Sequence, residues 1–191
     1  LGTLIDYSHF VSLEHLLPSV RRNLAEIAAS PQNTVIVCSG RERALMNEWL
    51  GDLPIWLVAE NGLFIRPPPA VSDAAMSAEA VAEPEWEMSK EDLDLAKEYS
   101  SLKPVFKYFE ARTPDSFTEV QEYTMTWHFQ SADEEFAEVQ AGDLQAHLVK
   151  VSGHAPVEVS LDMKRVEVRP YGVSKGAATA TILEKIQAEE A

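Results

Sequence analysis

The chain has 191 residues, a formal net charge of −15 at pH 7 and a single cysteine, Cys38. The acidic balance argues against nucleic acid and anionic membrane as partners, because both require a surface of Lys and Arg. One cysteine excludes an internal disulfide and fits a reducing, cytoplasmic location, and no apolar run is long enough to span a membrane. Because the first residue is Leu1, we expect the chain to be a domain of a longer protein.

Strands and helices are expected to alternate over the first third of the chain. Continuous β-branched and apolar runs predict strands buried on both faces, and amphipathic stretches predict helices between them. The expected strands are the end of one at 1–7, then 34–38, 55–59 and 63–66, and the expected helices are 18–29 and 42–50. The turn Glu60-Asn61-Gly62 is expected to form a hairpin with Asn61 at positive φ.

This alternation predicts a parallel sheet with right-handed crossovers, whose ligands lie beyond the carboxyl ends of the strands. Thr3, the loop Ser39-Gly40-Arg41 and Lys175 all fall in loops that are expected at this edge. Lys175 also precedes an Ala-rich helix expected at 177–188. A helix N-terminus with a lysine beside it favours an anion, so the loop around Lys175 is expected to face a phosphate.

The middle of the chain shows a different pattern. The segment 67–85 is rich in Pro, Ala and acidic residues and is expected to be a linker. A helix is expected at 89–109, capped by Ser89 and broken or kinked at Pro104. The other expected elements are a hairpin within 116–129, a helix at 133–151, and strands at 157–161 and 165–168.

These elements predict a smaller α/β unit inserted into the parallel-sheet core. The cap is expected to cover the open edge of that core. The expected core comprises residues 1–85 and 167–191, and the expected cap comprises residues 86–166.

Short motifs at the predicted strand ends and in the cap follow one another in a recognisable order. They are Gly2-Thr3-Leu4, Cys38-Ser39-Gly40-Arg41, Ala59-Glu60-Asn61-Gly62, Arg112-Thr113-Pro114-Asp115-Ser116-Phe117-Thr118-Glu119, Trp127-His128-Phe129-Gln130-Ser131-Ala132-Asp133, Val166-Glu167-Val168-Arg169-Pro170 and Gly172-Val173-Ser174-Lys175-Gly176. Together they resemble the haloacid-dehalogenase (HAD) superfamily and, within it, the trehalose-6-phosphate phosphatases. The resemblance is greatest to the C-terminal phosphatase-like domain of trehalose-phosphate synthases. It implies a HAD-like, Rossmannoid α/β core with an inserted α/β cap.

The resemblance also implies an activity, the dephosphorylation of trehalose 6-phosphate to trehalose through an aspartyl phosphate, with Mg²⁺ as the cofactor. It assigns Ser39 to hydrogen bonding with the phosphoryl group and Lys175 to stabilising its negative charge. Arg41, in the Ser39 loop, and Thr3, in the loop after the first strand, are expected to bind substrate. The family's nucleophile would precede Leu1, its general acid corresponds to Leu1, and its main metal ligands would follow the last residue. We therefore expect no metal ligands and no hydrolysis in this chain, and Mg²⁺ only in the complete parent.

In the cap, the resemblance assigns Glu119 and Glu167 to accepting hydrogen bonds from sugar hydroxyls. Gln121 and Gln130 stand where true phosphatases carry a lysine and an arginine, which weakens the expected grip on substrate. The second hypothesis is therefore a non-catalytic, phosphatase-like module that regulates an attached synthase domain. A third is a phosphatase for another sugar phosphate. His128 is expected to be a satisfied core or interface histidine.

Several of these assignments have a purely structural alternative. Ser39 is also a suitable turn or N-cap serine, and Arg41 could simply pair with Glu42 or Glu60. Glu119 is also compatible with a solvated strand position.

Overall fold

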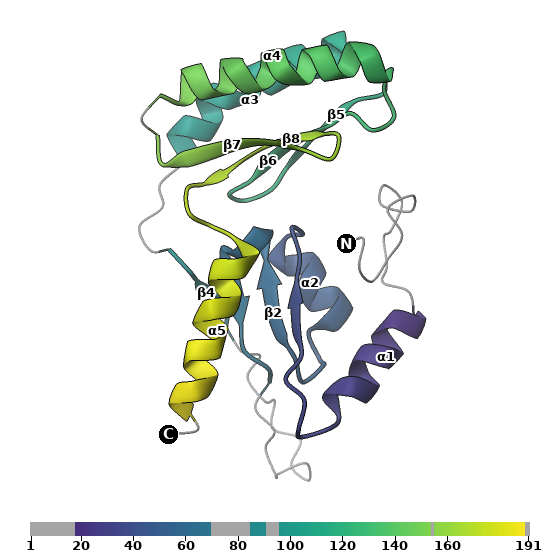
Figure 1. The fold of residues 1–191 in the computed structure, drawn as a ribbon, viewed down its shortest axis with the longest axis vertical. Coiled ribbons are helices and arrows are strands. Elements are labelled where there is room, and N and C mark those ends of the chain that lie inside the picture. Colours follow the sequence, from purple (N-terminus) through teal and green to yellow (C-terminus); the bar gives the residue numbers. More distant parts are fainter. Residues whose placement is uncertain (1–17, 70–84, 91–95, 154, 190–191) are drawn as a thin grey trace. The chain divides into compact units, whose positions relative to one another are not determined.

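The computed structural model describes residues 18–69, 85–90, 96–153 and 155–189 (Figure 1). The expected strand end at 1–7, and Thr3 with it, lie outside the described residues. The chain divides into two compact units, Leu1–Ser89 with Ser174–Ala191 and Lys90–Val173. The expected core–cap boundary after residue 166 therefore falls inside a strand of the second unit. Each unit is described by itself below.

The first unit contains the alternating elements expected at the start of the chain, together with the last helix. In chain order they are α1 (Pro18–Ala28), β1 (Ile36–Cys38), α2 (Arg43–Leu50), β2 (Trp56–Ala59), the 3₁₀ turn η2 (Glu60–Gly62), β3 (Phe64–Arg66), β4 (Glu87–Met88) and α5 (Lys175–Glu189). The helices and strands predicted for residues 18–66 are confirmed with slightly shorter bounds.

The sheet of the first unit is mixed, which corrects the expectation of a parallel sheet. Its order is β1-β2-β3-β4, and within the described residues only β1 and β2 run parallel. β3 runs antiparallel to β2 because η2 is a short turn, whereas a parallel connection needs a crossover of a dozen or more residues. The predicted hairpin is thus confirmed, and so is the positive φ of Asn61, at 57°.

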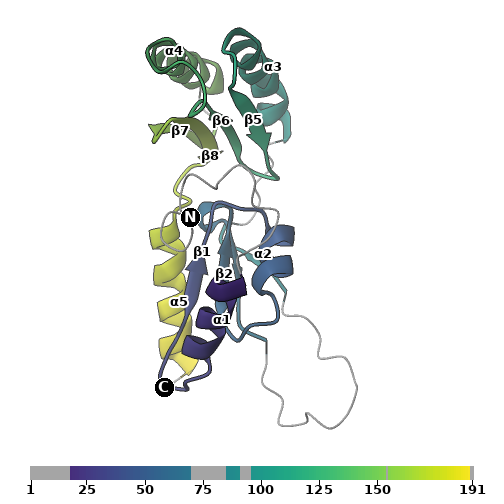
Figure 2. The same ribbon diagram turned by 90° about the vertical axis from the view of Figure 1, so that its right-hand side faces the viewer.

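Helices cover both faces of this sheet (Figure 2). Ala178 and Ile182 of α5 pack against Trp56, Val58 and Ile65. Helix α2 lies on the opposite side, and its buried residues are Met46, Trp49 and Leu50. All four residues of β2 are consequently buried, which explains why this segment is apolar throughout rather than alternating.

The strand β4 was not predicted, and it changes the interpretation of Ser89. The backbone N–H of Ser89 donates to the carbonyl of Leu63 at 2.7 Å, and its hydroxyl donates to the carbonyl of Gly62 at 2.9 Å. Ser89 therefore extends the β3–β4 pairing, and its predicted role as a helix N-cap is wrong. The following helix, α3, begins at Ala96.

The second unit is an antiparallel sheet covered on one face by two helices (Figure 1). Its elements are α3 (Ala96–Arg112), β5 (Phe117–Val120), β6 (Met125–His128), α4 (Glu134–Ser152), β7 (Val157–Asp162) and β8 (Arg165–Pro170). The strand order is β5-β6-β8-β7, and every pairing is antiparallel. The predicted hairpin, helix and pair of strands are all found.

Pro104 lies inside the continuous helix α3, so of the predicted break or kink the break is wrong. A proline within a helix costs about 3 kcal/mol, mainly through a lost hydrogen bond and a steric clash. Packing offsets this cost, because Leu102, Phe106 and Phe109 of α3 are buried in the core of the unit. That core is completed by Trp127 and other apolar residues of the sheet and of α4.

Candidate functional site

Three loops of the first unit meet at the carboxyl ends of β1 and β2. The first is the loop after β1. The backbone N–H of Ser39 donates to the carbonyl of Val58 at 2.9 Å, so Ser39 is held against β2, and its side chain is buried. The Ser39 hydroxyl oxygen accepts from the backbone N–H of Arg41 at 3.1 Å. A hydroxyl that accepts in this way keeps its own hydrogen to donate, for example to a phosphoryl oxygen.

The turn η2 is bonded directly to that loop. The N–H of Asn61 donates to the carbonyl of Ser39 and the N–H of Glu60 donates to the carbonyl of Arg41, each at 3.0 Å. A Cβ placed on Gly40 would lie 3.1 Å from Asn61 Oδ1, so the two loops pack at close range. The turn itself is in the left-handed region, with φ of 43° at Glu60 and 57° at Asn61.

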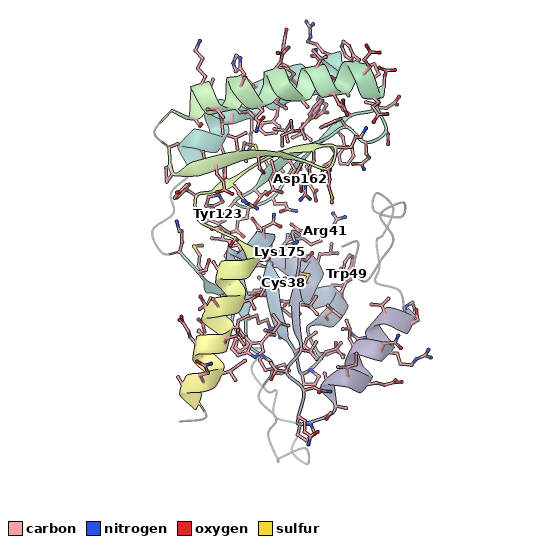
Figure 3. All side chains as sticks on the ribbon, viewed as in Figure 1. Cys38, Arg41, Trp49, Tyr123, Asp162 and Lys175 are labelled. Atoms are coloured by element: carbon pink, nitrogen blue, oxygen red, sulfur yellow. The ribbon has the colours of Figure 1, made fainter. Side chains whose placement is uncertain are left out.

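The third loop is the start of α5, which contacts η2 at Gly62. A Cβ placed on Gly62 would lie 2.3 Å from the carbonyl oxygen of Ser174 and 3.2 Å from the backbone nitrogen of Lys175. Ser174 caps the helix, because its hydroxyl accepts from the backbone N–H of Ala177 at 3.1 Å. Lys175 is the first residue of α5 and is exposed, in the same part of the unit as Cys38 and Arg41 (Figure 3).

The loops of Ser39 and Lys175 are therefore brought to one edge of the sheet, as the sequence predicted. An exposed ammonium group, a helix N-terminus and a held serine hydroxyl are the groups that bind a phosphate. The N-cap role of Ser174 was missed because the helix was expected to begin at residue 177. The signal was present, since a serine stands directly before the first helical residue.

The second candidate surface is the polar face of the antiparallel sheet. Glu119 pairs with Thr126, Thr126 with Glu167, and Glu167 with Ser160, so these residues form one row across all four strands. Side chains alternate along a strand, so neighbours such as Trp127 face the other way, into the core under α3 and α4. The row therefore lies on the face away from the helices.

The predicted sugar-binding residues are distributed over this face. Gln121 Nε2 donates to Glu119 Oε1 at 3.2 Å. Glu167 has a side chain only 5% exposed and forms an ion pair with Arg169, whose guanidinium also bonds Glu158. Gln130 lies apart from them, in the turn after β6. Sequence reasoning missed Arg169, although the alternation along β8 places it on the same face as Glu167.

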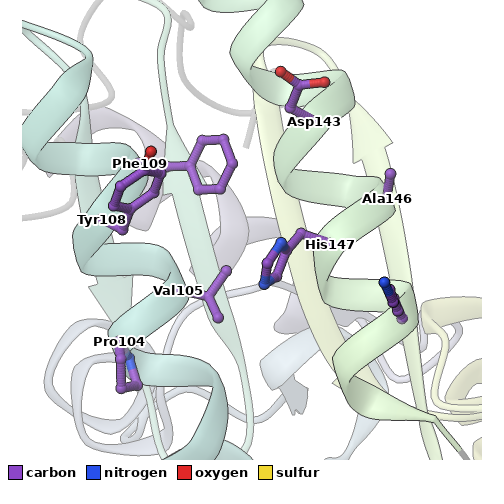
Figure 4. A pocket seen from close by; sticks show the side chains of 8 residues that line it. Pro104, Val105, Tyr108, Phe109, Asp143, Ala146 and His147 are labelled. Atoms are coloured by element: carbon purple, nitrogen blue, oxygen red, sulfur yellow. The ribbon is translucent and has the colours of Figure 1, made fainter.

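A separate open groove lies between the two helices of the second unit (Figure 4). Its volume is about 700 Å³. It is lined by Pro104, Val105, Tyr108, Phe109, Asp143, Ala146, His147 and Lys150. The polar lining residues are exposed and follow one another along α4, so they do not converge on one point in the way that a buried catalytic group would.

Within the described parts of the chain, no three His, Cys, Asp or Glu side chains gather closely enough to hold a metal ion. The described residues therefore do not fit a Mg²⁺ site by themselves. Among the helices that the structure describes, none has both the length and the apolar character needed to cross a membrane.

Comparison with protein families gives one match that covers almost the whole chain. The family model described as trehalose-phosphatase matches residues 2–191. The chain belongs to the trehalose-phosphatase family. Its fold is correspondingly of the HAD type, and HAD phosphatases typically use Mg²⁺.

Curated relatives of this trehalose-phosphatase chain include both synthases and phosphatases. This chain is 36% identical over 172 residues to the probable α,α-trehalose-phosphate synthase [UDP-forming] 4 of Arabidopsis thaliana, and the match covers 90% of this chain and 20% of the relative. It is also 31% identical over 189 residues to the trehalose-phosphatase of Schizosaccharomyces pombe, and this match covers 96% of this chain and 20% of the relative. The chain thus spans about a fifth of the length of these relatives and is homologous to their phosphatase-like region.

A solved structure supports the same conclusion. The C-terminal domain of trehalose-6-phosphate phosphatase from C. albicans matches with a TM-score of 0.70 and 27% identity. The match covers 85% of this chain and 52% of that one.

Proposed function

We propose that this chain is a sugar-phosphate-binding domain that recognises trehalose 6-phosphate. The phosphate would be bound by the loops of Ser39 and Lys175 in the first unit, with Arg41 contributing from the Ser39 loop and Thr3 assigned to the phosphate by the family resemblance. The polar face of the second unit, taken by itself, would provide the sugar-binding residues that the family resemblance assigns, namely Glu119, Gln121, Glu167 and Gln130. The observation that carries this proposal is the close packing of the Ser39 loop, η2 and the start of α5 at one sheet edge.

In a complete trehalose-phosphatase this domain would dephosphorylate trehalose 6-phosphate to trehalose. The residues of this chain would hold the phosphoryl group by hydrogen bonds from Ser39 and from backbone N–H groups of α5. Lys175 would stabilise the negative charge that the phosphoryl oxygens carry during transfer. The covalent step itself would be supplied by the catalytic aspartate that the family resemblance implies.

The second candidate is a phosphatase-like module that regulates an attached synthase domain. It is favoured by the synthase relatives, of which the chain matches about a fifth. The glutamine at 121 also supports it, because a neutral amide binds an anionic sugar phosphate less strongly than a lysine would.

Titration calorimetry of the purified chain with trehalose 6-phosphate, alone and with Mg²⁺, tests the proposed binding. We expect Lys175→Ala to weaken binding roughly 5- to 30-fold, which corresponds to about 1–2 kcal/mol for a lost charge-assisted contact. Lys185→Ala is the matched control. It removes a partly exposed lysine of the same helix that pairs with Glu87, so affinity should stay unchanged. Equal affinity of wild type and Lys175→Ala would refute the phosphate site.

Release of inorganic phosphate from trehalose 6-phosphate then separates the two candidates. Turnover above the buffer background with Mg²⁺ supports a phosphatase. Binding without turnover supports the regulatory module.

A further inference from the structure

We propose that His128 is a positioning residue that holds the Glu119 carboxylate in the orientation needed to accept sugar hydroxyls. The inference rests on the proposed function, in which Glu119 binds the sugar. It gives a role to a histidine that was expected to be a satisfied core or interface residue.

The two oxygens of the Glu119 carboxylate are held from two sides. His128 Nε2 lies 3.0 Å from Glu119 Oε2, and Gln121 Nε2 lies 3.2 Å from Oε1. An ionised carboxylate only accepts hydrogen bonds, so His128 must carry its hydrogen on Nε2 and donate it. Because each carboxylate oxygen can accept two hydrogen bonds, a carboxylate held in this way can still accept from a ligand.

His128 is itself rigidly placed. Its side chain is only 4% exposed, whereas that of Glu119 is 27% exposed. Its ring stacks on that of Phe117, the residue opposite it across the β5–β6 pairing, with 4.7 Å between ring centroids and 19° between planes. A buried, stacked imidazole is therefore the fixed partner of this pair, and the partly exposed carboxylate is the part that would otherwise move.

Fixing a glutamate before the ligand arrives removes a cost of binding. Glutamate is among the side chains that lose most rotamer freedom when they are ordered. If His128 orders Glu119 in the free protein, the sugar does not have to do so on binding, and affinity rises. The expected effect is about 3- to 10-fold in the dissociation constant, in the range for one immobilised side chain.

The test is a double-mutant cycle in the dissociation constant for trehalose 6-phosphate, measured by calorimetry on the full chain. The variants are His128→Leu, Glu119→Ala and the double variant. His128→Gln keeps an amide donor and should restore most of the affinity, and His147→Leu is the control for loss of an exposed histidine. We expect His128→Leu to weaken binding about 3- to 10-fold in the wild-type background and not at all beside Glu119→Ala.

The outcomes distinguish this inference from the proposed function. If Glu119→Ala leaves the affinity unchanged, the proposed sugar-binding face is wrong and the role of His128 falls with it. If Glu119→Ala weakens binding but His128→Leu only lowers the melting temperature, then the histidine is structural and this inference alone is wrong. Should His128→Leu fail to fold, the cycle is run with His128→Asn, whose shorter amide should not reach Glu119. Unchanged affinity in that variant would overturn the inference in the same way.

Discussion

Replacing Gly62 with alanine tests the packing on which the phosphate site depends. Gly62 has φ of 115°, a value that side-chain-bearing residues rarely adopt. An added Cβ would lie 2.3 Å from the carbonyl oxygen and 2.6 Å from the carbonyl carbon of Ser174. Both contacts are with backbone atoms, so no side-chain rotation can relieve them, and the start of α5 must move.

The strained backbone conformation and the clash with Ser174 together determine how far Gly62→Ala lowers the free energy of unfolding. A residue with a side chain held in this backbone region costs about 1–3 kcal/mol, and a forced backbone shift in a packed site costs about 1–3 kcal/mol more. We expect Gly62→Ala to lower the free energy of unfolding by about 3 kcal/mol. In a chain of this size each kcal/mol lowers the melting temperature by about 2–4 °C, so the expected decrease is about 6–12 °C.

The assay is thermal unfolding by circular dichroism, combined with calorimetric binding of inorganic phosphate. Gly176→Ala is the matched control, since its Cβ would meet only the Ser174 hydroxyl at 3.9 Å and the residue lies in α5. That control should keep or slightly raise the melting temperature, because alanine favours helix over glycine by about 1 kcal/mol. If Gly62→Ala melts within 1 °C of wild type and binds phosphate equally well, the proposed interlocking of η2 and α5 is wrong.

Two further predictions concern stability alone. The carboxylate of Asp133 caps α4 by accepting from the N–H of Phe136 at 3.0 Å. Asp133→Ala should therefore lower the free energy of unfolding, measured in urea, by about 1 kcal/mol. The control Asp143→Ala, on the exposed side of α4, should lower it by less than about 0.5 kcal/mol. The hydrogen bond from Arg21 lowers the pKa of Asp52. The ion pair therefore stabilises the folded state fully at pH values above the unfolded-state pKa of Asp52. This stabilisation is lost as the pH falls through the lower, folded-state pKa. Because the pair is largely exposed, Asp52→Asn should cost under about 1 kcal/mol at pH 7, and this difference should shrink in acid and in high salt; a cost that persists at pH 2 would show another cause.

The elements that the sequence predicted correctly are those with enough residues to show a period. Helix α4 buries one face, so its buried residues recur at helical spacing, as Ala137, Ala141, Leu144 and Leu148 do. Strand β2 is buried on both faces, so all of its residues are apolar. β4 could not be predicted in this way, because the two residues Glu87 and Met88 show no period. It forms because β3 presents an open edge of backbone groups, which is a tertiary property.

Only part of the candidate site could be predicted from the sequence. Ser39 follows β1, so its place at the carboxyl end of the first sheet could be predicted from strand order. Lys175 follows β8 of the other sheet, and its loop meets the Ser39 side of the first unit only because α5 packs there. The approach of Gly62 to Ser174 was not predictable, because it depends on how α5 packs on the finished sheet. The pair of His128 and Glu119 also escaped prediction, since the strand register decides it.

The first unit is assembled from two separated stretches of chain, and α5 is synthesised only after the whole second unit. Until Ala178 and Ile182 emerge from the ribosome, the sheet face formed by Trp56, Val58 and Ile65 has no helix to cover it. At roughly 5–20 residues per second, this exposure lasts about 6–20 s, whereas the second unit is one continuous stretch and can fold during that time. During that interval the nascent chain carries an uncovered apolar sheet face, and transiently exposed apolar surface of this kind is what promotes aggregation and recruits chaperones.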